Sequence, residues 1–318
     1  MGKLIRKALL LTVAALATAA CGGGGDNTVT STPNPPSVVQ PPGDPGTDPV
    51  DPGTEILEVQ LSGSVGDGPI VGATVRVYAA DGTVLSEFDS VSSPTADYEM
   101  TIKTQGKNYP LTVVATGGTD LVTGAAPDFS LEATLMRPSS RVVANLNPFT
   151  TLVVATAREL GEVSDQTLSQ AQDTVSRRYG YGLDLGLIPD VMGTAIDETT
   201  VANVVKSSET AGEALRRTRD ALQSAGGNVS ADDVIAAMAS DLTDGVLDGQ
   251  GGPMADGQVA AVANAASAQV LLEAYTNRLS VYGADAMTAM DSAIATVRPS
   301  ATVMTSEVAI PAEGLEQA

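Results

Sequence analysis

The stretch "NLNPFTTLVVATAREL", residues 145–160, marks a change of pattern in the middle of the chain. Before it, apolar residues recur at every second position, and within it they recur with the helical period of about 3.6. Asn147 suits an N-cap, Pro148 suits the first helical position, and Gly161 suits a helix end. We therefore expect a region of β-strands to give way here to a region of helices. The apolar stripe of the first helix consists of Phe149, Leu152, Val153, Ala157 and Leu160.

The segment before this point alternates apolar and polar residues. In "EVQLSGSVGDGPIVGATVRVYAADGTVLSEF", residues 58–88, turn pairs stand at Asp67-Gly68 and Asp81-Gly82. Short segments with the same alternation follow it at about ten-residue spacing: "DYEMTI", "YPLTVVATGG", "DFSLEATLM" and "RVVANL". This spacing predicts an antiparallel β-sandwich over residues 56–146. One face of the hairpin is expected to carry Val71, Ala73, Val75 and Val77.

The opening of this segment resembles a known family. Its glycines, prolines and apolar residues follow the order "G-x-V…G-x-P-I-x-G-A-x-V", and Tyr98–Ile102 and Leu111–Gly118 fit the two strands that come next. This pattern is similar to the carboxypeptidase regulatory-like domain, a transthyretin-like sandwich, and the resemblance implies a spacer or recognition module without catalysis. The residues that carry the opening are Gly63, Val65, Gly68, Pro69, Ile70, Gly72, Ala73, Val75, Val77, Tyr78, Asp81 and Gly82.

The segment after residue 147 reads as helices. A second helix is predicted from near Ser164 to Tyr179, and a longer one, capped by Asp197, carries Glu213 and Arg217 on its outer face. Its inward side is expected to hold Val201, Val204, Val205, Ala211, Leu215 and Leu222. Ser230 and Asp233 form a capping box before a fourth helix. The alanine-rich run 258–272 is expected to be the central helix of a bundle, and a last helix uses Met287, Met290, Ile294 and Val297 before Pro299.

The predicted fold class is thus α+β. An N-terminal antiparallel, transthyretin-like sandwich, residues 56–146, precedes an all-α helical bundle, residues 147–300, and a loose tail, residues 301–318. A signal peptide, residues 1–20, and a disordered tether, residues 21–55, come before both.

The first residues have the layout of a secretory signal. Lys3, Arg6 and Lys7 precede an apolar run from Ala8 to Ala20, which is too short to span a bilayer. Cys21, the only cysteine, follows small residues directly, and this resembles the lipobox of bacterial lipoproteins. The resemblance implies that Cys21 is lipidated and anchors the chain, and the glycine after it implies the outer membrane of a Gram-negative bacterium. The sequence leaves open whether the protein faces the surface or the periplasm.

The tether that follows is rich in Pro, Gly, Thr and Asp and has little to bury, so it is expected to hold the folded body away from the lipid. The chain has 17 Lys+Arg against 38 Asp+Glu, a net charge of −21. Such an acidic chain is repelled by nucleic acid and by anionic headgroups, so no nucleic-acid partner is expected and the anchor provides the membrane contact.

Composition also restricts the chemistry. The chain has no histidine and no tryptophan, which excludes Ser-His-Asp, Cys-His and His/Cys zinc sites. No catalytic residue and no cofactor is predicted. Paired carboxylates remain possible, but aromatic residues make up only 3% of the chain, whereas sugar-cleaving clefts commonly stack rings on the substrate.

Two groups of charged residues are candidate binding sites. Asp241, Asp244 and Asp248 in "DLTDGVLDGQGG" are the best metal candidates, for calcium, although they lack the EF-hand register and also suit an acidic turn at a helix end. Five arginines could form an anion site or, as the sequence favours, structural ion pairs. They are Arg177, Arg178, Arg216, Arg217 and Arg219.

The leading hypothesis is a non-enzymatic outer-membrane lipoprotein that presents a binding, adhesion or scaffolding body to an envelope protein or glycan. One alternative is a carboxylate-based polysaccharide hydrolase, which needs two acidic residues about 5–10 Å apart in a deep cleft. Another is a calcium-stabilised adhesin.

Overall fold

The computed structural model describes most of the chain between residues 55 and 288. The described residues are 55–86, 90–181, 183–197, 199–276, 278–281, 284–286 and 288. The predictions for the signal peptide, Cys21 and the tether lie outside these residues, and so do those for the helix that ends before Pro299 and for the tail.

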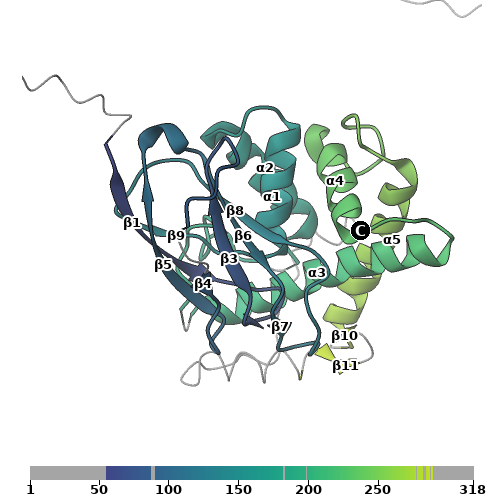
Figure 1. Ribbon diagram of the computed structural model, residues 1–318. Helices are drawn as coiled ribbons and strands as arrows, with labels where there is room; N and C mark the ends of the chain where they lie inside the picture. The colour runs from purple at the N-terminus through teal and green to yellow at the C-terminus, as the bar shows by residue number, and fades with distance from the viewer. Residues whose placement is uncertain are drawn as a thin grey trace, which may run out of the picture. The chain divides into compact units, whose positions relative to one another are not determined.

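The strands form several small sheets (Figure 1). The largest has the order β4-β3-β6-β8, the next has the order β5-β1-β9, and two-stranded pairs are formed by β2 with β7 and by β10 with β11. The strands are β1 (Leu57–Ser64), β2 (Ile70–Val71), β3 (Thr74–Tyr78), β4 (Ser90–Val91), β5 (Asp97–Thr104), β6 (Leu111–Thr116), β7 (Thr119–Asp120), β8 (Leu131–Leu135), β9 (Arg141–Val143), β10 (Ser280–Val281) and β11 (Ala284–Asp285).

Strand β1 is the centre of the three-stranded sheet. It pairs with β5 in antiparallel register from Leu57 opposite Thr104 to Ser64 opposite Asp97. On its other side it pairs with β9 in parallel, with Leu61 opposite Val142. Its inward residues Val59 and Leu61 are fully buried, as the alternation of the sequence requires.

Three of the helices begin where local signals place them, whereas the helix predicted to be capped by Asp197 begins after Thr200. Asn147 caps α1 through a capping box with Thr150, and Ser164 caps α2 in the same way with Thr167, so both predicted starts are confirmed. The capping box of Ser230 with Asp233 is confirmed as well. The helices are α1 (Pro148–Glu159), α2 (Asp165–Tyr179), α3 (Val201–Ser224), α4 (Ala231–Asp241) and α5 (Gly257–Tyr275), with short 3-10 turns η1 (Gly106–Asn108) and η2 (Leu242–Asp244).

The predicted fold class, an antiparallel, transthyretin-like sandwich followed by an all-α helical bundle, is wrong. The described residues form a mixed α/β fold with five helices and small sheets, and these sheets do not form a clear sandwich. One sheet contains the parallel pair β1–β9, and edge strand β8 contacts helix α1. Buried residues of strands and helices belong to one hydrophobic cluster. Alternation showed that each strand has a buried face, but it did not show that a helix would cover it.

The central helix also differs from the prediction. Helix α5 leaves Leu272 and Tyr275 exposed, whereas α3 buries most of its residues, including charged ones. The Glu213–Arg217 ion pair is present at 2.6 Å, but Glu213 is buried rather than on an outer face. Figure 1 shows α3 running across the lower part of the body, from below β4 and β3 toward α5. Helix α3 therefore packs on α1, α4 and α5 and is joined to the turn after β1 by the ion pair between Arg216 and Asp67.

A glycine lets β1 approach the chain after β9. A Cβ on Gly63 would overlap the carbonyl oxygen of Ala144 and touch the ring of Tyr98. We expect Gly63→Ala to lower the free energy of unfolding by about 1–3 kcal/mol, because neither backbone can move away without breaking the sheet. Ser62→Ala, one residue earlier on the same strand, is the control and should stay within about 0.5 kcal/mol of wild type in urea unfolding. Equal stability of the two variants would contradict the close approach.

Candidate functional site

The outer edge of β9 is the starting point of the candidate site. Gln60 N–H donates to the Ser140 carbonyl at 2.9 Å, and Ala144 N–H donates to the Ser62 carbonyl at 2.8 Å. With the parallel register, these bonds turn the N–H and C=O groups of Val142 toward β1. The N–H and C=O groups of Arg141 and Val143 therefore point the other way. Among the described residues, only Ser139 Oγ reaches this edge, by donating to the Arg141 carbonyl at 3.0 Å.

The chain that continues beyond the end of β9 is hydrogen-bonded to another segment. Asn145 lies two residues after Val143, so its backbone N–H points in the same direction, away from β1. This N–H donates to the Met192 carbonyl at 2.8 Å. Its side chain donates to the Thr194 carbonyl at 2.6 Å and accepts from the Ser64 hydroxyl at 3.1 Å. Asn145 thus joins β1 to the turn at residues 192–194, and no described residue of that turn is hydrogen-bonded to the backbone of Val143.

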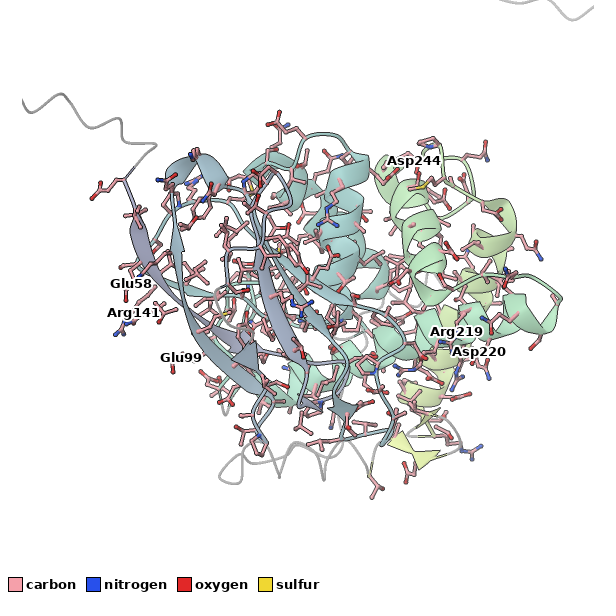
Figure 2. The ribbon with its side chains drawn as sticks, in the orientation of Figure 1. Glu58, Glu99, Arg141, Arg219, Asp220 and Asp244 are labelled. Carbon is pink, nitrogen blue, oxygen red and sulfur yellow. The ribbon has the colours of Figure 1, made fainter. Side chains whose placement is uncertain are left out.

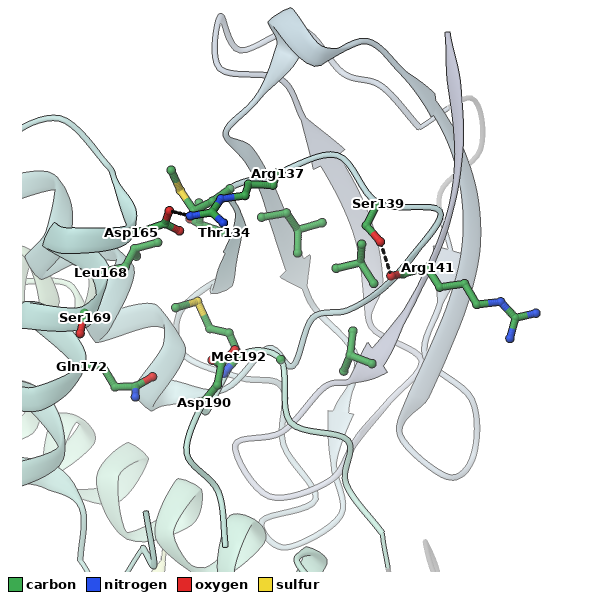
Figure 3. Close-up of a pocket in the computed structure, with 15 residues that line it drawn as sticks. Thr134, Arg137, Ser139, Arg141, Asp165, Leu168, Ser169, Gln172, Asp190 and Met192 are labelled. Atoms are coloured by element: carbon green, nitrogen blue, oxygen red, sulfur yellow. Dashed lines mark hydrogen bonds and ion pairs between the residues drawn. The ribbon is translucent and has the colours of Figure 1, made fainter. Parts of the chain in front are cut away.

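Helix α2 faces this edge across a groove (Figure 3). The groove has a volume of about 500 Å³. Its helical wall is a single face of α2, with positions i, i+3, i+4 and i+7 occupied by Asp165, Leu168, Ser169 and Gln172. We call this hollow the β9 groove. Its other lining residues are Thr134, Leu135, Met136, Arg137, Ser139, Arg141, Val142, Val143, Asp190, Met192 and Gly193.

Charges stand at the ends of the β9 groove and apolar groups lie between them. Arg137, after β8, forms an ion pair with Asp165 at the start of α2 (Figure 3). Asp190 at the opposite end accepts a hydrogen bond from Met192 N–H at 2.9 Å. Arg141 projects outward from the sheet in Figures 2 and 3 and makes no ion pair with another described residue. The arrangement suits the binding of a ligand better than the transfer of a proton.

A second hollow of about 420 Å³ lies on the other side of Val143. It is lined by the ends of β1 and β5 and by residues 195–196. Three serines, Ser62, Ser64 and Ser93, give it a polar surface. Asp97 at its margin accepts from the hydroxyls of Ser93 and Thr95, so this carboxylate is held by its own turn.

A third group of polar residues is buried between β1, β2 and α3. The Arg216 guanidinium binds Asp67 at 2.6 Å, Glu209 at 2.7 Å and Glu213 at 3.2 Å. All four side chains are at most 7% exposed. One cation faces three carboxyl groups, and Asp67 Oδ1 and Glu209 Oε2 have no hydrogen-bond partner.

Burial favours the protonated form of two of these carboxyl groups. Burial raises the pKa of Asp67 to about 7, against the opposing effect of the Arg216 guanidinium. Burial likewise raises the pKa of Glu209 well above its ordinary value, and nearby Asp67 and Asp120 add to the effect. Asp120 is also buried, and burial raises its pKa. These acids have shifted pKa values but are sealed from solvent, so they hold the fold together and offer no accessible acid–base pair.

The three aspartates predicted as calcium ligands lie at the end of α4, where Figure 2 labels Asp244. The buried Asp241 carboxylate accepts from the N–H groups of Gly249, Gln250 and Gly251 at 2.7, 2.9 and 3.1 Å. Asp248 also accepts from Gln250 N–H, at 3.0 Å, whereas Asp244 accepts only from its own turn. The structure thus brings Asp241 and Asp248 together and leaves Asp244 apart. Within the described ranges, no three Asp, Glu, His or Cys residues are grouped to hold a metal ion.

Three of the five arginines for which the sequence favoured structural ion pairs form such pairs. Arg216, Arg217 and Arg219 all form ion pairs with carboxylates, so structural pairing is confirmed for them. Arg177 donates to the Asp173 carbonyl on its own helix. Sequence reasoning missed the β9 groove altogether. The one signal for it was Asn145, a polar residue inside an apolar strand segment.

Comparison of this chain with protein-family models, with curated proteins and with solved structures found no match. The resemblances to lipoproteins and to the carboxypeptidase regulatory-like domain therefore have no independent support. None of the helices in the described part of the chain combines the length and apolar character needed to cross a bilayer.

The role of Asp241 can be tested by substitution. Asp241→Ala removes the acceptor of three backbone N–H groups in a loop packed against α4, where a Cβ on Gly251 would overlap the Asp241 carbonyl. We expect the free energy of unfolding to fall by roughly 2–4 kcal/mol. Chemical denaturation monitored by circular dichroism measures this change.

Asp244→Ala is the matched control, because its exposed carboxylate accepts one hydrogen bond, and it should cost less than about 1 kcal/mol. We expect the melting temperature of the wild type to be the same in millimolar calcium and in chelator, since the Asp241 oxygens already have donors. A rise with calcium that Asp241→Ala abolishes would assign these residues to a metal site instead.

The buried acids predict how stability depends on pH. Asp67 holds its proton more tightly in the folded state than in the unfolded chain, where its pKa is near 3.8. Its stabilising contribution is therefore complete below about pH 4 and is lost as the pH rises through about 7. We expect the free energy of unfolding to decline over this range, and to decline less in Asp67→Asn. Parallel profiles for the two proteins in urea would show that Asp67 does not titrate in this way.

Proposed function

We propose that this protein is a non-enzymatic lipoprotein of the outer membrane of a Gram-negative bacterium, which presents its folded body to a partner in the cell envelope. The observation that carries the proposal is the setting of Cys21. The only thiol of the chain follows small residues directly, between a basic and apolar leader and a tether rich in proline and aspartate. Acyl chains on one residue anchor a protein that is otherwise acidic and repelled by anionic headgroups.

The body has a surface that suits binding. The β9 groove combines apolar residues, an open backbone edge and charges at both ends in a hollow of about 500 Å³. Binding sites commonly have this composition, with a few polar groups placed around an apolar lining. Binding at this groove requires no catalytic group.

The described contacts favour neither alternative. The hydrolase hypothesis needs two carboxyl groups in an open cleft, but the acids with clearly raised pKa values around Arg216 are buried. The calcium hypothesis needs oxygens that converge on an ion, but Asp241 accepts three backbone N–H groups. Both remain alternatives that the stability measurements above and assays on polysaccharides address.

Anchoring is tested on Cys21. We expect wild-type protein to incorporate a palmitate analogue and to fractionate with the outer membrane, and Cys21→Ser to lose the label and leave that fraction. A Thr18→Leu variant is the matched control, because it keeps the cysteine and should be labelled at least as well. An unlabelled wild type, or a Cys21→Ser protein that remains membrane-bound, would refute the proposal.

A further inference from the structure

One wall of the β9 groove is a strand edge with open hydrogen-bonding groups. The N–H groups of Arg141 and Val143 and the carbonyl of Val143 point away from β1, and no other described residue binds them. An open edge is a template on which another extended segment can pair. The lining face of α2 lies opposite this edge, on the other side of the groove (Figure 3).

The chain that continues from β9 is already hydrogen-bonded to another part of the molecule, the turn at residues 191–194. Asn145 N–H donates to the Met192 carbonyl, two residues beyond Val143 and with the same parity. This turn thus bonds to the next outward-pointing N–H along the edge, and Met192 and Gly193 also line the groove. A ligand strand beside Val143 would continue the row of hydrogen bonds that Met192 begins.

The lining sets the side-chain chemistry of such a ligand. Residues on an added strand alternate between two faces. Toward the interior they would meet Leu168, Met192 and Val142, which are buried or half-buried and apolar. The opposite face of the added strand would be turned to solvent, because the Arg141 guanidinium extends away from the groove (Figure 3). The favoured sequence therefore alternates apolar residues with polar ones.

We propose that the β9 groove binds an extended segment of a partner protein by adding it as a strand to the edge of β9. Val143 supplies a donor and an acceptor, Arg141 supplies a further donor, and α2 holds the inward side chains. This inference deepens the proposed function, since it assigns the partner's chemical class and the site at which it binds.

The test uses the purified full-length lipoprotein in detergent micelles. A phage-displayed library of random linear peptides is selected on it, and enriched peptides are synthesised and their affinities measured. We expect apolar residues at every second position, and affinity at least roughly tenfold weaker for Ser169→Trp, which fills the groove from α2. Gln170→Trp is the matched control, because this exposed neighbour does not line the groove, and it should bind as wild type does.

A backbone variant separates strand pairing from simple burial. Val143→Pro removes the N–H that points into the groove but leaves the bonds to β1, which use Val142 and Ala144. We expect it to weaken peptide binding as strongly as Ser169→Trp does, and more strongly than Val143→Ala, which shortens the side chain but keeps the N–H. Hydrogen exchange gives a readout that does not depend on how Val143→Pro folds. In the wild-type protein, the amides of Arg141 and Val143 should exchange quickly and that of Val142 slowly, and bound peptide should slow the first two.

Several results would overturn the inference. One is that no selected peptide binds wild type more tightly than Ser169→Trp. A second is that the enriched sequences have a helical rather than an alternating periodicity. A third is that the Arg141 and Val143 amides are protected from exchange in the free monomeric protein. Protection that rises with protein concentration, together with a dimer in light scattering, would mean that a second copy covers the edge. Because these measurements use purified protein, they can fail while Cys21 labelling succeeds, or succeed while it fails, so the two proposals are judged separately.

Discussion

The buried guanidinium of Arg216 is the contact on which the attachment of helix α3 to the strand region depends. It stands on α3, yet one of its partners, Asp67, belongs to the turn between β1 and β2, 149 positions earlier. Removing one partner of such a buried pair leaves an uncompensated charge, which costs far more than a surface ion pair contributes. The turn is also fitted closely to the helix, because a Cβ on Gly212 would overlap Asp67. Charge and shape therefore define one position of the turn on α3.

Strand β1 connects this turn to the β9 groove. Strand β1 ends at Ser64, three residues before Asp67, and Ser64 donates to the side chain of Asn145. Asn145 in turn holds residues 192–194, and the pairing of β1 with β9 fixes the strand edge beside them. The groove walls thus consist of segments that are far apart in the sequence but are joined through β1. A loosened Arg216 cluster would shift the turn, and with it the end of β1 that supports Asn145.

The helix starts could be predicted from the sequence because their causes are local. Asn147 and Thr150 are three residues apart, and their reciprocal hydrogen bonds need nothing from the rest of the chain. Which charged residues are buried in the core could not be predicted in this way. Glu213 and Arg216 are charged and suggest a solvated face, but Asp67 from a distant turn makes their burial possible. The parallel pairing of β9 with β1 has no local signature either, so neither the absence of a sandwich nor the groove beside β9 could be read from alternation.

An open strand edge is a risk of aggregation that proteins limit by shortening or covering it. Here β9 has three residues, and beyond it the strand line is covered by Met192 at Asn145. At the other end, Ser139 binds the Arg141 carbonyl, and the Arg137–Asp165 pair reaches across to α2. A second copy of this chain, with its net charge of −21, meets electrostatic repulsion before it can pair. The open part of the edge is therefore short, and it suits a single extended segment. Pairing of two sheets needs several successive residues, because their hydrogen bonds must compensate for the conformational entropy lost by two chains.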